Sequence, residues 1–300
     1  MSKGFFSEAL SPGKLLLITA TMRAGKSSTA GYIIEKGIPL GYNFYTNMIF
    51  FDYEEIDEAI DEGILKQKKE YYHRVPQQVH TKTKMSELIL GLYQTRKNIT
   101  LLDEALLFAS SKKGSSRDIR WFEGFVTQIG KMNSSIILIS QAKSKLATLL
   151  KEDIPSYELK VKKISFSNRY VEVWYNPGQN REEGNESRQV DTWYHVPPTH
   201  LPYDTLAPAG LEYDIDMERF INSISKLNSL KVRKVIPDMI KKELEEKTKN
   251  GESKKDIIVG LIQDNPDITT GQIMEKLNEL GLRTAVNYIT RIKREIGVFS

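Results

Sequence analysis

The chain has 300 residues, with 43 Lys or Arg, 39 Asp or Glu and a formal net charge of +4. This length suits one globular domain of ordinary size plus a smaller one. The absence of cysteine excludes disulfides, thiolate metal sites and cysteine nucleophiles, and a metal centre built on the four histidines is not expected. No apolar run reaches the ~18 residues of a membrane span, and the N-terminus is too polar for a signal peptide. We therefore expect a cytoplasmic protein without a membrane partner.

The most informative loop comprises residues 19–28 and directly follows an apolar run over residues 15–18. It fits the phosphate-loop pattern G-x-x-x-x-G-K-[ST] except at Ala20, which replaces the first glycine. The backbone N–H groups of such a loop hold phosphate oxygens. Lys26 would reach the β- and γ-phosphates of ATP, and Ser27 would be a ligand of Mg²⁺. The residues expected to bind the nucleotide are Thr21, Met22, Arg23, Ala24, Gly25, Lys26, Ser27 and Ser28.

A second apolar run, residues 99–102, ends in the adjacent carboxylates of Asp103 and Glu104. The end of a strand can present Asp103 to the Mg²⁺ shell. Glu104 is then placed to orient or deprotonate the water that attacks the γ-phosphate. Such a pair can also form a turn or a helix N-cap. In combination with the phosphate loop, it indicates an ATP hydrolase.

A third apolar run, residues 135–140, ends in Gln141. An amide at the end of a parallel strand can sense the γ-phosphate or position water, because ligands bind at these strand ends. The alternative is a glutamine that only opens a surface loop.

Residues 14–150 alternate between strands and helices, which predicts an α/β domain with a mostly parallel sheet covered on both faces. Besides the three apolar runs, a further strand is expected at residues 43–47, and helices are expected at 85–95 and 118–132. From residue 157 polar and apolar side chains alternate, which predicts an antiparallel extension of the sheet. Its strands are expected at residues 157–166, 169–175 and 190–196, with a solvated loop at 179–188.

The end of the chain, residues 251–300, is predicted to form a separate small unit. Residues 241–254 are charged and interrupted by glycine, which indicates a linker. Three short helices are expected beyond it, with a tight turn between the last two, as in a (winged) helix-turn-helix domain. The predicted domains are an ATPase domain at residues 1–200, a connecting segment and linker at 201–250, and the helix-turn-helix domain at 251–300.

The third of these helices, expected over residues 282–296, is basic on its free face. Arginine and asparagine side chains suit contacts with DNA phosphates and base edges. The alternative is a three-helix bundle that binds protein through a solvated basic face. The residues expected to contact DNA are Arg283, Thr284, Asn287, Arg291 and Arg294.

The order of these motifs resembles the FtsK–HerA superfamily of DNA-pumping ATPases. Within it, the chain is most similar to viral DNA-packaging ATPases and zonula occludens toxin-like phage assembly ATPases. The resemblance covers residues 14–175 and is carried by residues 20–28, 101–104 and 140–141, with 45–47 also similar. The chain departs from the pattern at Ala20 and lacks the membrane segment of the toxin-like branch.

The resemblance implies that Gln141 is a sensor glutamine and that an arginine acts across a subunit boundary. The candidates for that arginine are Arg117 and Arg120, which can equally be solvated residues at a helix start. The implied assembly is a homo-oligomeric ring, a pentamer or hexamer.

The resemblance further implies an ATP-driven translocase of double-stranded DNA, most similar to a viral genome-packaging motor. A capsid or portal protein would then be a further partner, in the host cytoplasm or in association with the virion. Two alternatives stay open: a DNA-binding regulator switched by ATP, and a plasmid or conjugation coupling ATPase that acts on single strands.

Overall fold

The computed structural model describes residues 3–21, 23–66, 70–109, 117–141, 143–150, 154, 156–163, 169–178, 186–204, 207, 210–265, 268–279 and 286–295. The chain divides into two compact units, Met1–Pro237 and Asp238–Ser300. In the described part, no helix combines the length and the hydropathy that a membrane span requires.

The first unit is an α/β domain. Its elements in chain order are α1 (Lys3–Ala9), β1 (Leu15–Thr19), α2 (Lys26–Gly37), β2 (Asn43–Thr46), α3 (Ile56–Asp61), β3 (Val79–Thr81), α4 (Met85–Gln94), β4 (Asn98–Leu102), α5 (Leu106–Ala109), α6 (Arg117–Gln128), β5 (Ser134–Ser140), β6 (Ser156–Lys163), β7 (Arg169–Asn176), β8 (Arg188–Val196) and α7 (Met217–Lys226). Short 3₁₀ helices include η1 (Ile38–Leu40), η2 (Tyr53–Glu55), η4 (Ile129–Met132) and η5 (Lys143–Lys145).

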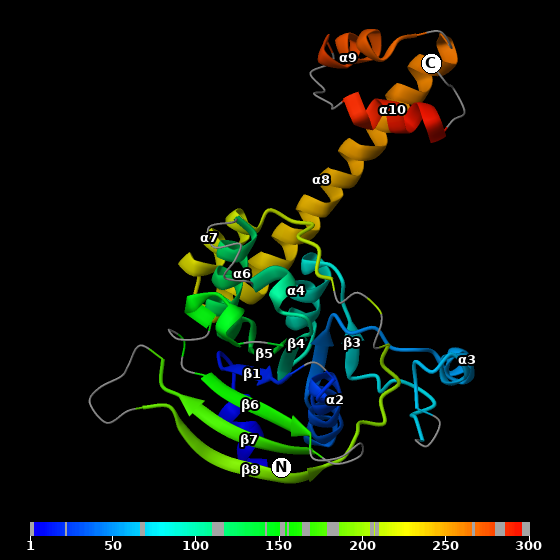
Figure 1. The fold of residues 1–300 in the computed structure, drawn as a ribbon. Coiled ribbons are helices and arrows are strands. Elements are labelled where there is room, and N and C mark those ends of the chain that lie inside the picture. The colour runs from blue at the N-terminus through cyan, green and yellow to red at the C-terminus, as the bar shows by residue number, and fades with distance from the viewer. Residues whose placement is uncertain are drawn as a thin grey trace. The chain divides into compact units, whose positions relative to one another are not determined.

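One eight-stranded sheet organises this unit, in the order β3-β2-β4-β5-β1-β6-β7-β8. The strands from β3 to β6 pair in parallel, whereas β7 pairs antiparallel with β6 and with β8. This confirms the predicted mostly parallel sheet with an antiparallel extension (Figure 1). Since β5 lies between β1 and β4, the carboxyl ends of these three strands meet at one edge of the sheet.

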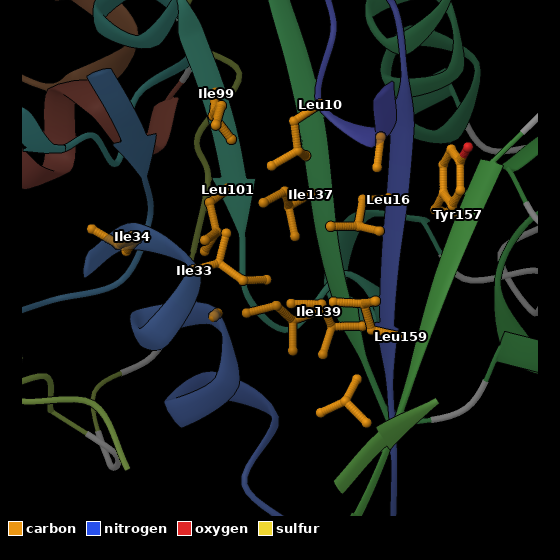
Figure 2. Packing of buried hydrophobic residues seen from close by; sticks show 14 of the residues in the cluster. Leu10, Leu16, Ile33, Ile34, Ile99, Leu101, Ile137, Ile139, Tyr157 and Leu159 are labelled. Atoms are coloured by element: carbon orange, nitrogen blue, oxygen red, sulfur yellow. The ribbon is translucent and has the colours of Figure 1, made fainter. Parts of the chain in front are cut away.

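The core lies on both faces of the parallel strands. Strands β1, β4 and β5 are buried along their whole length, as expected for apolar runs covered on two sides. Figure 2 shows Ile33 of α2 pointing toward Leu101 and Ile139 on one face. Helices α4 and α6 lie on the opposite side of the sheet from α2 (Figure 1). The rigid sheet thereby fixes the start of α2 relative to the strand ends.

Several short elements were not predicted from the sequence. Strand β3 has three residues, too few for an alternating pattern, and is held by pairing with β2. Helix α1 is short and is anchored by the buried rings of Phe5 and Phe6. Arg188, expected in a solvated loop, is the first residue of β8 and lies opposite Tyr175 of β7. These elements depend on pairing with distant segments, which a local pattern does not reveal.

The segment between β8 and α7 packs along α2, from Ser28 to Glu35. Thr199 donates its backbone N–H to Ser28 Oγ at 3.1 Å and its hydroxyl to Glu35 of α2. The backbone N–H of His200 is also donated to Glu35. Farther along the segment, the backbone of Tyr203 forms an isolated antiparallel β-bridge with Phe50. We call residues 197–204 the α2 strap.

The second unit contains the C-terminal part of α8 (Ser229–Asp264), α9 (Thr270–Glu279) and α10 (Val286–Glu295). Its core is formed by buried isoleucines and one leucine from the three helices and from the connection between α8 and α9: Ile258, Ile262, Ile268, Ile273, Leu277, Ile289 and Ile292. Thr269 caps α9: its Oγ1 accepts the Gln272 N–H at 3.3 Å, while its own N–H is donated to Gln272 Oε1 at 2.9 Å.

The expected linker over residues 241–254 is instead part of α8. Its lysines and glutamates are good helix formers, and Lys242 and Glu246 lie 4.0 Å apart as an i, i+4 pair. A single glycine in a helix costs about 1 kcal/mol, which this helix accommodates. Charge and one glycine therefore did not indicate irregular structure here.

Candidate phosphate-binding and catalytic site

The predicted loop lies between β1, which ends at Thr19, and α2, which begins at Lys26. Gly25 precedes the helix with φ 95° and ψ 31°, a left-handed conformation that glycine adopts without steric cost. Among the described non-glycine residues, positive φ occurs at Arg23, Lys97, Glu104, Asn133 and His195. Ala20 is not one of them, so the alanine that replaces the first glycine of the pattern is free of this strain. Met22 lies outside the described residues.

The Lys26 ammonium lies inside the loop. Its Nζ donates to the carbonyl oxygens of Ala20 at 3.4 Å and Thr21 at 3.2 Å. Burial lowers the pKa of Lys26, and the nearby charges of Asp103 and Glu104 oppose that shift. The amine is therefore held within the loop by two of its carbonyl oxygens, where a phosphate chain would need a cation.

Ser27 and Asp103 come together across the sheet edge. Ser27 Oγ donates to Asp103 Oδ2 at 2.7 Å. Both are hard oxygen donors of the kind that Mg²⁺ prefers, and Mg²⁺ commonly takes one or two carboxylates together with substrate phosphates. In the described part of the chain no group of three or more His, Asp or Glu gathers to hold a metal. The two oxygens thus fit an ion that completes its shell on a nucleotide and water.

Asn47, the residue after β2, holds the backbone of Asp103 through two hydrogen bonds. Its Nδ2 donates to the Asp103 carbonyl at 3.1 Å, and its Oδ1 accepts the Asp103 N–H at 2.7 Å. Asn47 is fully buried. Burial also raises the pKa of Asp103, while hydrogen bonds from Ser27 and the Glu104 N–H favour its charged form. The carboxylate is therefore positioned by its own backbone as well as by its hydrogen-bond donors.

Glu104 marks the point where the chain leaves β4. Its φ is 50°, unusual for a residue with a side chain, and its N–H is donated to Asp103 Oδ1 at 2.7 Å. The next residue, Ala105, donates its N–H to the Ile139 carbonyl of β5 at 2.9 Å. Left-handed conformations at non-glycine residues are costly and concentrate at functional sites. Here the left-handed residue lies directly after the proposed Mg²⁺ ligand Asp103.

The other predicted catalytic residues are Gln141, at the end of β5, and Arg117 and Arg120, on α6. Gln141 is exposed and directly follows β5, whose last residue, Ser140, pairs with Thr19 of β1. Arg117 and Arg120 are exposed on α6, and the Arg117 guanidinium lies 4.4 Å from the centre of the Trp121 ring. No described contact joins either arginine to the phosphate loop of the same chain.

Two further buried side chains adjoin the loop and were not predicted from the sequence. Glu158 of β6 accepts from Thr19 Oγ1 at 2.7 Å and lies 3.0 Å from Lys143 Nζ. Arg169, the first residue of β7, donates from Nη1 to the Gly25 carbonyl at 3.1 Å. Neither belongs to a motif, and both reach the loop only through the pairing of β1 with β6 and of β6 with β7. Asn47 could have been found, because it follows a strand at the same sheet edge.

The predicted DNA contacts are described only in part. Arg283 and Thr284 lie outside the described residues, and only the backbone of Asn287 and Arg294 is described, within α10. Arg291 is exposed, with its guanidinium 5.2 Å from the centre of the Tyr288 ring.

No protein-family model matches the chain. No curated protein matches it either. Among solved structures it is similar to the N-terminal domain of zonular occludens toxin from Neisseria meningitidis, with 11% identity and a TM-score of 0.34 over 60% of this chain and 95% of that one. It is also similar to the genome packaging NTPase of Sulfolobus turreted icosahedral virus 2, in complex with ATP-gammaS, with 10% identity and a TM-score of 0.36 over 62% and 98%. A third is the flagellar accessory protein FlaH from Methanocaldococcus jannaschii, with 13% identity and a TM-score of 0.36 over 65% and 90%.

Proposed function

We propose that this chain is an ATPase that binds Mg²⁺-ATP in the loop of residues 20–28. The observation that carries the proposal is the hydrogen bond of 2.7 Å between Ser27 and Asp103, with Lys26 inside the same loop. This places a cation, a hydroxyl and a carboxylate together at the start of a helix, where backbone N–H groups bind anions. The same three groups are those that phosphoryl transfer uses for positioning and charge neutralisation.

Each residue then has a distinct task. Lys26 would neutralise charge on the β- and γ-phosphates, and Ser27 with Asp103 would hold Mg²⁺, which would supply further positive charge for phosphoryl transfer. Glu104 accepts a proton from the attacking water, and Gln141 orients that water. Thr21, Arg23, Ala24 and Ser28 line the remainder of the phosphate chain.

The test is ATP hydrolysis by purified protein. We expect Lys26→Ala to abolish turnover and weaken ATP binding, and Glu104→Gln to bind ATP but hydrolyse it ~100- to 10,000-fold more slowly. The matched control is Lys36→Ala, because Lys36 is exposed on the same helix and contacts the Tyr32 ring. Wild-type turnover in Lys26→Ala would refute the proposal.

We further propose that hydrolysis drives translocation on double-stranded DNA in a homo-oligomeric ring, as in genome packaging, with a capsid or portal protein as a further partner. The C-terminal unit would be a helix-turn-helix module that contacts DNA through Arg291 and its neighbours on α10. Displacement of a triplex-forming strand with ATP tests this, since only a motor that runs along duplex removes that strand. Slow ATP turnover that DNA does not stimulate, with tight sequence-specific binding, would favour the ATP-switched regulator instead.

A shared active site would follow from the ring. Arg117 or Arg120 would then complete the site of a neighbouring subunit, an effect worth ~1,000-fold or more in rate. Mixing Glu104→Gln subunits with Arg117→Ala or Arg120→Ala subunits should restore part of the activity. If assembly is intact and no mixing ratio restores turnover, neither arginine acts in this way.

A further inference from the structure

Arg169 is a buried cation directly beside the phosphate loop. It is 7% exposed, and its Nη1 donates to the Gly25 carbonyl at 3.1 Å. Its Nε is buried and has no hydrogen-bond partner in the described part of the chain. A guanidinium carries five N–H donors, so one carbonyl leaves most of its hydrogen-bonding capacity unused.

The surroundings of Arg169 do not neutralise its charge. Among the described residues no carboxylate forms an ion pair with it. Burial lowers its pKa, with the Tyr203 hydroxyl group opposing that shift. A further cation is near, because Lys163 of β6 is the register partner of Arg169. Burial lowers the pKa of Lys66, and the charges of Lys163 and Arg169 lower it further. A buried charge is strongly unfavourable unless it is paired, so this position favours an anion.

The absence of a side chain at Gly25 leaves the space that Arg169 occupies. A Cβ atom at Gly25 would lie 2.4 Å from Arg169 Nη1 and 2.8 Å from Arg169 Cδ. The guanidinium therefore lies against the backbone of the residue that immediately precedes Lys26. The start of α2, with its positive end of the helix dipole, is at the same place. Three independent sources of positive charge converge here: Lys26, the helix N-terminus and Arg169.

We propose that Arg169 is a second phosphate-binding cation of the site, supplied by the same chain, and that its unpaired N–H groups bind the polyphosphate of the nucleotide. This rests on the proposed function of the loop. Binding of the phosphate chain would give the buried guanidinium the counter-charge that the described protein groups do not provide. Charge-assisted hydrogen bonds to such a group correspond to a ~10- to 100-fold change in affinity.

The experiment compares Arg169→Gln and Arg169→Lys with the control Arg188→Gln, which changes an exposed arginine at the start of β8. Titration calorimetry measures the affinity for Mg²⁺-ATP and for inorganic tripolyphosphate, and thermal unfolding is measured without ligand. We expect Arg169→Gln to weaken both affinities ~10- to 100-fold. Arg169→Lys should be intermediate, because lysine keeps the charge but loses the planar fork. The ligand-free protein should be no less stable to heat, because Arg169→Gln removes a buried charge that pairs with no carboxylate among the described residues.

Three outcomes would overturn the inference: unchanged affinities, loss of affinity for ATP but not for tripolyphosphate, or a fall in ligand-free stability that accounts for the whole loss. The second outcome would assign Arg169 to the nucleoside, and the third to the fold. Lys26→Ala distinguishes this failure from failure of the proposed function. If Lys26→Ala weakens binding and Arg169→Gln does not, the loop binds nucleotide without Arg169.

Discussion

Gly25 is the residue at which the loop tolerates least change. Its φ of 95° disfavours any side chain, and a Cβ there would also meet Arg169. We expect Gly25→Ala to cost about 1–2 kcal/mol for the conformation alone, and more through displacement of Arg169. ATP affinity should fall together with the free energy of unfolding, measured by urea denaturation.

Gly41→Ala is the matched control for this change. Gly41 has φ 80°, but a Cβ there would meet no atom within 4 Å, so this substitution isolates the conformational cost. If the two substitutions destabilise the protein equally and Gly25→Ala retains ATP affinity, contact with Arg169 is irrelevant to the loop.

Asn47 holds the backbone of Asp103, the proposed Mg²⁺ ligand, through two hydrogen bonds. Asn47→Ala would leave the partly buried Asp103 N–H and carbonyl without these partners, at a cost of up to about 1–3 kcal/mol for each unsatisfied group. We expect lower stability and slower ATP turnover together. Asn43→Ala, at the start of β2 and with an exposed hydrogen bond to the Arg96 carbonyl, should leave turnover intact. Equal turnover in both variants would contradict the assigned role.

These residues also show what the sequence could predict of the site. Lys26, Ser27, Asp103 and Glu104 were found because each lies in a short segment that follows a recognisable apolar strand. Arg169 and Glu158 were not, because each reaches the loop through strand pairing between segments distant in the sequence. A sequence motif identifies residues that are close along the chain, whereas Arg169 and Glu158 are close to the loop only across the sheet.

At the scale of elements, α2 packs so closely against the α2 strap that a Gly→Ala substitution in this helix is expected to destabilise the protein. Alanine normally stabilises a helix by about 1 kcal/mol relative to glycine. At Gly31 of α2, however, a Cβ would lie 2.5 Å from Thr199 Cγ2. Overpacking costs about 1–3 kcal/mol, so Gly31→Ala should destabilise the protein, as measured by urea denaturation.

Gly260 of α8 provides the contrast, because nothing lies within 4 Å of a Cβ there. Gly260→Ala should stabilise its helix by up to about 1 kcal/mol. Stabilisation by both substitutions would mean that the strap yields easily to α2. The long strands and helices of this domain could be predicted because they are continuous apolar runs or periodic patterns, whereas the strap is neither and is defined by its hydrogen bonds to α2.

At the scale of the whole molecule, the C-terminal unit tests whether the chain engages DNA directly. Arg291 is exposed on α10, as a phosphate contact requires. In the full chain, Arg291→Ala should weaken binding to all duplexes alike and reduce the slope of log K against log salt concentration by ~0.9. The matched control is Lys276→Ala on α9, also exposed. An unchanged slope in Arg291→Ala would favour a protein-docking role for this unit.

The order of strands β4, β5 and β1 has a consequence for folding kinetics. Leu15 pairs with Ile136, and Thr100 also pairs with Ile136, so the site is complete only after distant segments have joined. Non-local pairing of this kind forms slowly. A nucleotide that needs the finished site binds the native state alone, and at 100 times Kd it stabilises that state by about 2.7 kcal/mol. Stabilisation absent from the transition state slows unfolding and leaves refolding unchanged. In stopped-flow measurements, ATP should therefore lengthen the lifetime of the native protein without shortening the time needed to reach it.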